Sequence, residues 1–115
     1  MKAKTTTEEN VYFVYDAIED SVIRKFLDAQ RKRTRHTYST YFRRLAEFTN
    51  ETGQEMLDNV DEWLHKIFTF QEWLKDKGYS DYYVESATGC IRGFFSFYRK
   101  PLILTSLERR KLDEG

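Results

Sequence analysis

The chain has 115 residues, with 19 basic and 19 acidic side chains, one cysteine and one proline. This length fits one domain with one hydrophobic core, and 40% hydrophobic with 33% charged residues is typical of a globular chain. No apolar run approaches the ~20 residues that span a bilayer. The first residues lack the basic stretch and apolar block of a signal peptide. One cysteine and two histidines make neither a disulfide nor a zinc site. We therefore expect a soluble, cytoplasmic domain with no metal, no cofactor and no membrane contact.

Charge is unevenly distributed along this neutral chain. Residues 24–44 carry a net charge of +7 and residues 92–111 carry +5, whereas residues 1–23 carry −3 and residues 45–91 carry −7. If the two basic segments meet in the fold, the domain has a positive face that suits an anionic polymer such as nucleic acid. Ordinary solvated helix faces are the alternative explanation.

The hydrophobic pattern predicts an all-α domain of four to five helices. Residues 1–18 form an arm, of which the apolar residues 11–15 should pack on the core. A first helix should start with Asp20 or Ser21 as its N-cap and fade into the basic run at residues 31–35. A second should open at Thr34 or Arg35 and end at Gly53, acting as a C-cap glycine.

Two further helices complete the predicted bundle. The third should begin at a cap on Asp58 or Asn59, bury a face centred on Ile67 and end at Gly78. The fourth should be capped by Ser80 and end before Pro101, the only proline. Two glycines inside it, Gly89 and Gly93, favour close approach of another helix or of a DNA backbone. Residues 102–115 have the composition of a connector.

Catalytic chemistry has little support in the sequence. Neither His36 nor His65 is accompanied by a glycine-rich loop or a serine elbow. Cys90 lies on the apolar stripe of the fourth predicted helix, where a buried and inert thiol is expected. We predict no catalytic residue in this chain.

The strongest candidate site is the basic run at the start of the second predicted helix. It combines arginines, lysine and threonines with a helix N-terminus, whose free N–H groups attract phosphate, and arginines and small hydroxyl residues are common donors to phosphate oxygens. A second basic stripe follows a four-residue repeat on the fourth predicted helix. The predicted DNA contacts are Arg33, Thr34, Arg35, His36, Thr37, Arg44, Arg92, Ser96, Arg99 and Lys100.

Three segments carry a family resemblance: RHTYSTYFRRLAEFTNETG, EWLHKIFTFQEWLKDKGYS and YVESATGCIRGFFSFYRKP. Their shared features are a Thr (Thr34 or Thr37) before a Tyr, a Gly before a Ser cap, and small residues before paired aromatics, here Tyr38, Leu45, Phe48, Gly78, Ser80, Phe94, Phe95 and Tyr98. Residues 19–101 thereby resemble the N-terminal core-binding domain, also called SAM-like, of the tyrosine recombinase (phage integrase) family. Residues 102–115 would then be the interdomain linker.

The resemblance implies that the chain is one jaw of a DNA clamp, contributing to DNA recombination and integration. Its implied partners are double-stranded DNA, its own catalytic domain in the full-length protein and neighbouring recombinase protomers. The family's catalytic His-x-x-Arg pattern is absent, because Ser39 follows His36 by three residues and Phe68 follows His65, so no enzyme activity is expected here. The alternatives are a helical protein-interaction module, using the acidic third helix and Trp73, and a small DNA-binding regulator.

Overall fold

The computed structural model describes residues 14–113, and this part of the chain is helical without strands. A helical turn at residues 14–17 is followed by α2 (Ser21–Asp28), α3 (Lys32–Phe48), α4 (Gly53–Asp58), α5 (Val60–Asp76), α6 (Asp81–Phe97) and α7 (Ser106–Asp113). The predicted all-α class is confirmed. The predicted packing of residues 11–13 falls outside the described residues.

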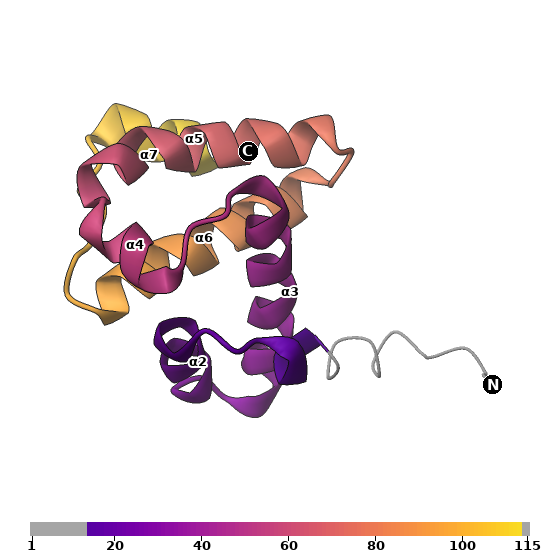
Figure 1. The fold of residues 1–115 in the computed structure, drawn as a ribbon. Coiled ribbons are helices and arrows are strands. Elements are labelled where there is room, and N and C mark those ends of the chain that lie inside the picture. Colours follow the sequence, from indigo (N-terminus) through magenta and orange to yellow (C-terminus); the bar gives the residue numbers. More distant parts are fainter. Residues whose placement is uncertain (1–13, 114–115) are drawn as a thin grey trace.

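The central element of the core is α6. It packs against α2, α3, α5 and α7, and its inward stripe is fully buried at Val84, Ala87, Ile91, Phe94 and Phe95. Figure 1 shows α5 along one edge of the molecule, with α2 and the start of α3 at the opposite edge. The helices therefore share one core.

Local capping chemistry fixes most of the helix ends as predicted. The Asp20 side chain accepts hydrogen bonds from the amides of Val22 and Ile23 and so caps α2. Ser80 accepts from Tyr83 N and caps α6. At the end of α5, Gly78 has a φ of +92° and Tyr79 N donates to Leu74 O at 3.3 Å. This is the Schellman arrangement, which needs a left-handed residue after the helix.

The predicted start of the second helix at Thr34 or Arg35 and its predicted end at Gly53 are both wrong. α3 begins at Lys32, with Arg31 in the N-cap position. α3 stops at Phe48, because Thr49 is extended (φ −142°, ψ 154°). Thr52 then opens a separate short helix, α4, through a capping box in which Thr52 and Glu55 each accept from the other's backbone amide. The Thr-x-x-Glu spacing at residues 52–55 is the sequence signal for this start. Gly53 therefore begins a helix rather than ending one.

Gly53 is the point of closest approach between α4 and α2. Its amide donates to Asp20 Oδ2 at 2.7 Å, so the carboxylate that caps α2 also binds the start of α4. A Cβ on Gly53 would lie 3.0 Å from Ile23 Cγ1 and 3.1 Å from both Asp20 Oδ1 and Val22 Cγ1. The absence of a side chain at this position allows the two helix ends to share one carboxylate.

The segment after α6, predicted as a connector, is folded onto the core. Leu102, Leu104 and Leu112 are buried. Gln71 of α5, itself 1% exposed, donates from Nε2 to the carbonyl oxygens of Leu112 at 3.2 Å and of Lys111 at 3.4 Å. α7 thus belongs to the same packing unit as α5 and α6. Among the described helices, none has the length and apolar character required to cross a membrane.

Gly53→Ala should destabilise the domain by about 1–3 kcal/mol, because the added methyl group overpacks the α2–α4 contact. Gly89→Ala is the matched control: it lies inside α6, where a Cβ would meet nothing within 4 Å. There alanine should stabilise the domain by roughly 0.5–1 kcal/mol through helix propensity. Urea unfolding of both variants measures the difference, and equal midpoints would contradict this account of Gly53.

Candidate nucleic-acid interface

The N-terminal end of α3 carries the densest positive charge in the described chain. Arg31 occupies the N-cap position, and arginine has no side-chain acceptor for the first-turn amides. The first turn of α3 contains no acidic residue. The positive end of the helix dipole is therefore followed by side chains that are also positively charged, including Arg33 and Arg35. Lys25 adds an exposed cation in the last turn of α2.

The predicted α3 residues divide between two faces of the helix. Arg33, Thr37, Thr40 and Arg44 recur at three- and four-residue spacing and so form one stripe, named here the α3 stripe. Arg33 and Thr37 are exposed, and Arg44 is half-buried about 16 Å further along the axis. Arg35 projects from the opposite side of α3 and His36 from the edge of the α3 stripe, and both contact Tyr15. Thr34, at the first turn, is half-buried.

Hydroxyl groups of the α3 stripe are hydrogen-bonded within the helix. Thr37 Oγ1 donates to Arg33 O at 3.2 Å, and Thr40 Oγ1 donates to Thr37 O at 2.7 Å. Their protons are therefore directed at carbonyl groups and would have to rotate to reach a phosphate. The guanidinium groups are the stronger candidates for anion contact on this face.

Arg44 is held at the far end of the α3 stripe by polar neighbours. Its Nη1 donates to Glu47 Oε1 at 3.1 Å and to the Tyr79 hydroxyl at 3.2 Å. The Tyr79 ring stacks on Tyr83 with centroids 4.3 Å apart. Burial raises the pKa of Tyr83 to about 12, so this phenol stays neutral at physiological pH. Arg44 is thus positioned and partly neutralised by Glu47.

Arg35 and His36 contact the ring of Tyr15, which precedes α2. The guanidinium carbon of Arg35 lies 5.3 Å from the ring centroid, and the His36 ring meets it edge-on at 5.4 Å. Arg24 of α2 covers the same ring at 4.2 Å. Tyr15 and Arg24 were not among the predicted site residues, although Arg24 was counted in the basic segment. No pattern in the sequence links residue 15 to residue 35, because their contact depends on the fold.

The environment of His36 favours its neutral form. Burial lowers the pKa of His36, and the nearby charges of Arg35 and Lys32 lower it further, whereas Asp16 opposes them. At pH 7 the imidazole therefore adds no charge to this face. It contributes packing and hydrogen-bonding capacity instead.

The predicted residues on α6 lie on a different flank from α3. Tyr83 and Phe97 face α3 and α2, with ring centroids 5.2 Å from Tyr41 and 5.5 Å from Phe26, whereas Phe95 faces Trp63 of α5 at 5.9 Å. An α-helix turns by about 100° per residue. The predicted DNA-contact positions on α6 therefore lie within about 100° of Phe95 around the helix, on the side away from α3. These positions are Arg92 and Ser96; Arg99 follows the end of α6, where its φ of +62° departs from the helix. The fold therefore does not join the two basic stripes into one continuous row.

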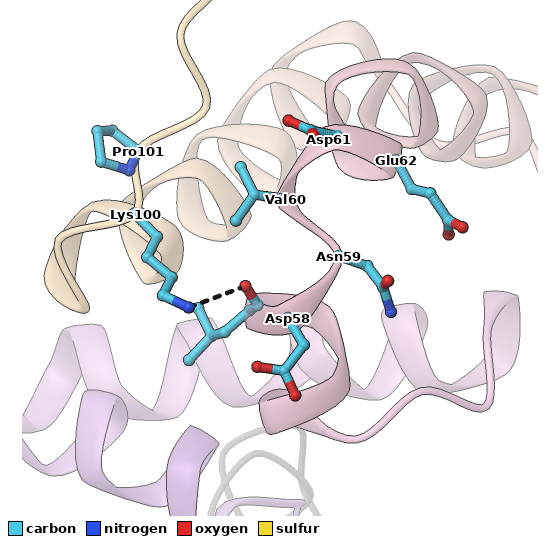
Figure 2. Close-up of a pocket in the computed structure, with 8 residues that line it drawn as sticks. Asp58, Asn59, Val60, Asp61, Glu62, Lys100 and Pro101 are labelled. Carbon is cyan, nitrogen blue, oxygen red and sulfur yellow. Dashed lines mark hydrogen bonds between the residues drawn. The ribbon is translucent and has the colours of Figure 1, made fainter.

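Lys100 lies among acidic residues (Figure 2). Its Nζ donates to the carbonyl oxygen of Leu57, at the end of α4, over 3.4 Å. The cavity of about 470 Å³ beside it is also lined by the acidic residues Asp58, Asp61 and Glu62. Figure 2 shows the Glu62 side chain directed away from Lys100. Lys100 stabilises the α4–α5 corner by this bond, in a negative part of the surface.

Other candidate chemistry has little support in the described residues. Cys90 is 1% exposed, and burial raises the pKa of its thiol well above the usual value. The predicted inert thiol therefore agrees with its surroundings. Within residues 14–113, no group of three or more His, Cys, Asp or Glu side chains is arranged to hold a metal ion.

Comparison with known proteins leaves the family resemblance as an expectation. No protein-family model, curated protein or solved structure matches this chain. The functional argument for the chain therefore depends on its own residues and their geometry.

The lowered pKa of His36 predicts how the stability of the domain changes with pH. Because its folded-state pKa is lowered, the unfolded chain binds a proton first as the pH falls below about 6.5, and the stability contributed by neutral His36 is lost from there downward. The melting temperature should thus fall less between pH 7 and pH 5 for His36→Gln than for the wild type. His65→Gln, an exposed site on α5, is the control. Identical pH profiles for all three proteins would exclude this role of His36.

Arg99 occupies a position that favours glycine. It has a φ of +62°, and Lys100 N donates to Phe95 O at 2.9 Å in the same arrangement that Gly78 forms after α5. Arg99→Gly should therefore raise stability by up to about 1 kcal/mol, whereas Gly78→Ala should lower it by about 1–2 kcal/mol. Urea midpoints test both changes. A less stable Arg99→Gly protein would show that the arginine side chain makes a compensating contact.

Proposed function

We propose that this domain binds double-stranded DNA, mainly through phosphate contacts from the α2–α3 end. The observation that carries the proposal is the N-terminus of α3, which has basic residues around it and no acidic residue in its first turn. Arg33 and Arg44 on the α3 stripe offer donors about 16 Å apart along one side of α3. Lys25 of α2 and Arg35, on the other side of α3, are further cations at this end. Phosphate contacts of this kind give affinity with little sequence preference.

The exposed face of α6 leaves space for a backbone to approach. Gly89 lies on this face with Arg92 and Ser96, about 120° around the helix from Tyr83, which contacts Tyr41 of α3 at 5.2 Å. Gly89 is exposed, and a Cβ there would meet nothing within 4 Å. Packing within the described chain therefore does not require glycine at this position. The proposed use of this space is the close approach of DNA.

The second basic stripe has a smaller part in the proposal. Arg92 and Ser96 lie on the α5 side of α6, Arg99 follows the end of that helix, and Lys100 donates to the Leu57 carbonyl. A duplex held against α3 would reach this flank only at the margin of its footprint. We therefore place the main contacts on α3 and treat Arg92 as a test of how far the interface extends.

The resemblance to the core-binding domain of tyrosine recombinases extends this proposal. In that setting the chain would be one jaw of a clamp around DNA, and would act with its own catalytic domain and with neighbouring protomers in DNA recombination and integration. The chain itself would not cleave DNA, because the family's His-x-x-Arg pattern is absent.

A protein-interaction module is the second candidate, favoured by two exposed apolar residues near the C-terminus. Ile103 is 75% exposed and Leu107 is 72% exposed, and the cost of leaving both in water would be recovered at an interface. The predicted docking role of Trp73 has less support, because its ring packs against Phe48 at 5.7 Å and Phe70 at 6.1 Å.

Titration of a labelled DNA duplex at several salt concentrations tests the proposal. We expect a Kd of roughly 10⁻⁴–10⁻⁶ M at physiological salt, and Arg33→Ala should reduce the slope of log K against log salt by about 0.9, as for one phosphate contact fewer. Lys77→Ala removes the same charge at the end of α5, away from the α2–α3 end (Figure 1), and should leave the slope unchanged.

Each other outcome of this titration has a defined meaning. A reduced slope for Arg92→Ala would extend the interface across α6. Equal slopes for Arg33→Ala and the wild type would remove α3 from the interface. Absence of binding at low salt would exclude the DNA proposal and leave the protein-interaction module.

A further inference from the structure

The turn at residues 14–18 lies over the basic cluster at the α2–α3 end. The Tyr15 ring is contacted by the guanidinium groups of Arg24 at 4.2 Å and Arg35 at 5.3 Å, and by the edge of His36 at 5.4 Å. The Tyr15 hydroxyl donates to Asp28 at the end of α2. One side chain thus occupies the faces of two arginines from two different helices.

Backbone and apolar contacts hold this turn in place. Arg24 Nη1 donates to the carbonyl oxygen of Ile18 at 3.0 Å, and Val14 is 8% exposed and part of the core. The turn is therefore attached at its beginning, at Tyr15 and at its end. Its position relative to α2 and α3 is a specific packing arrangement.

The turn also brings negative charge to the basic cluster. The pKa of Arg24 is raised, chiefly by a side-chain hydrogen bond with Tyr15 and to a smaller extent by the carboxylates of Asp28 and Asp16. Asp16 also opposes the lowering of the His36 pKa. Asp28 Oδ1 lies 3.9 Å from Arg24 Nε. Part of the positive field that would attract a polyanion is thus neutralised from within the chain.

We propose that residues 14–18 are an autoinhibitory cover that competes with phosphate for Arg24 and Arg35. This inference depends on the proposed DNA-binding function and adds a form of regulation to the same site. Cation–π contacts at partly exposed sites are weaker than hydrogen bonds from arginine to phosphate. A closely spaced phosphate array can therefore displace Tyr15, whereas isolated anions at low concentration leave the cover closed.

Two measurements on the full chain test the cover. The first is the rate at which phenylglyoxal modifies Arg24 and Arg35, followed by mass spectrometry of the peptides. The second is titration of a labelled DNA duplex at low salt. Tyr15→Ala should raise the modification rate of both arginines, and should increase duplex affinity about fivefold or more through loss of two cation–π contacts. Tyr82→Ala, a 78% exposed tyrosine on α6, should change neither quantity.

A second variant tests the cover without removing the Tyr15 ring. Asp16→Asn keeps the Tyr15 ring and removes one exposed negative charge, so it should increase duplex affinity about twofold without lowering the melting temperature. Glu85→Gln on the exposed side of α6 is its control and should have a smaller effect. If Tyr15→Ala unfolds the domain, the duplex affinity of Asp16→Asn becomes the test. An affinity equal to that of the wild type would overturn the proposed cover.

The outcomes separate this inference from the proposed function. Unchanged arginine modification in a folded Tyr15→Ala protein would overturn the cover, even if DNA still binds. Increased modification with unchanged or weaker DNA affinity would show that Tyr15 does not compete with phosphate, and would also overturn it. Faster modification without DNA binding by any variant would instead exclude the proposed function, and with it the inhibitory role of the turn.

Discussion

The geometry of the basic end of this domain depends on one carboxylate, that of Asp20. One oxygen accepts from the first amides of α2, and the other accepts from Gly53 N at the start of α4. Two helix N-termini therefore share a single negative charge, which favours both dipoles. Because α2 leads directly into α3, this shared cap sets where Arg24 and the start of α3 lie relative to the core. Glycine suits this close contact, because a Cβ on residue 53 would lie only 3.0 Å from Ile23 Cγ1 and 3.1 Å from Asp20 Oδ1.

Contacts between buried aromatic residues hold α2 and α3 against α6. Phe26 of α2 contacts Phe42 of α3 at 6.0 Å and Phe94 of α6 at 5.7 Å, each ring edge to face. The Tyr98 hydroxyl at the end of α6 donates to Val22 O at 2.5 Å. The α2–α3 pair is thereby fixed on one flank of α6, and α5 covers the other. This division explains why the basic stripes of α3 and α6 do not meet.

Electrostatic context, rather than charge count, decides what each cation can do. Arg33 is exposed on a helix face with other basic residues, whereas Lys100 donates to a backbone carbonyl beside three carboxylates. Arg35 lies against an aromatic ring, and Arg44 is paired with Glu47 at 3.1 Å. A chain with zero net charge can therefore present a positive surface on one pair of helices, while its other cations serve local packing.

The sequence predicted the helices with strong periodicity and clear caps. Asp20, Ser80 and Gly78 end or start helices where expected, because capping is a local property of a few residues. The Gly53 prediction failed because glycine suits both a helix end and a close helix contact, and only the partner helix distinguishes the two. The division of the α3 residues, the contacts of Tyr15 and the position of Lys100 could not be predicted, since each depends on segments distant in sequence.

The proposed contact between the α2–α3 end and DNA phosphates can be followed residue by residue. The most direct measurement is an NMR titration of the ¹⁵N-labelled chain with a short DNA duplex, which follows each backbone amide separately. We expect progressive shifts of the amides of residues 24–25 and 31–37, which weaken as salt is added, with little change at residues 58–62. Shifts confined to the region of Ile103 and Leu107, or no shifts at low salt, would contradict it.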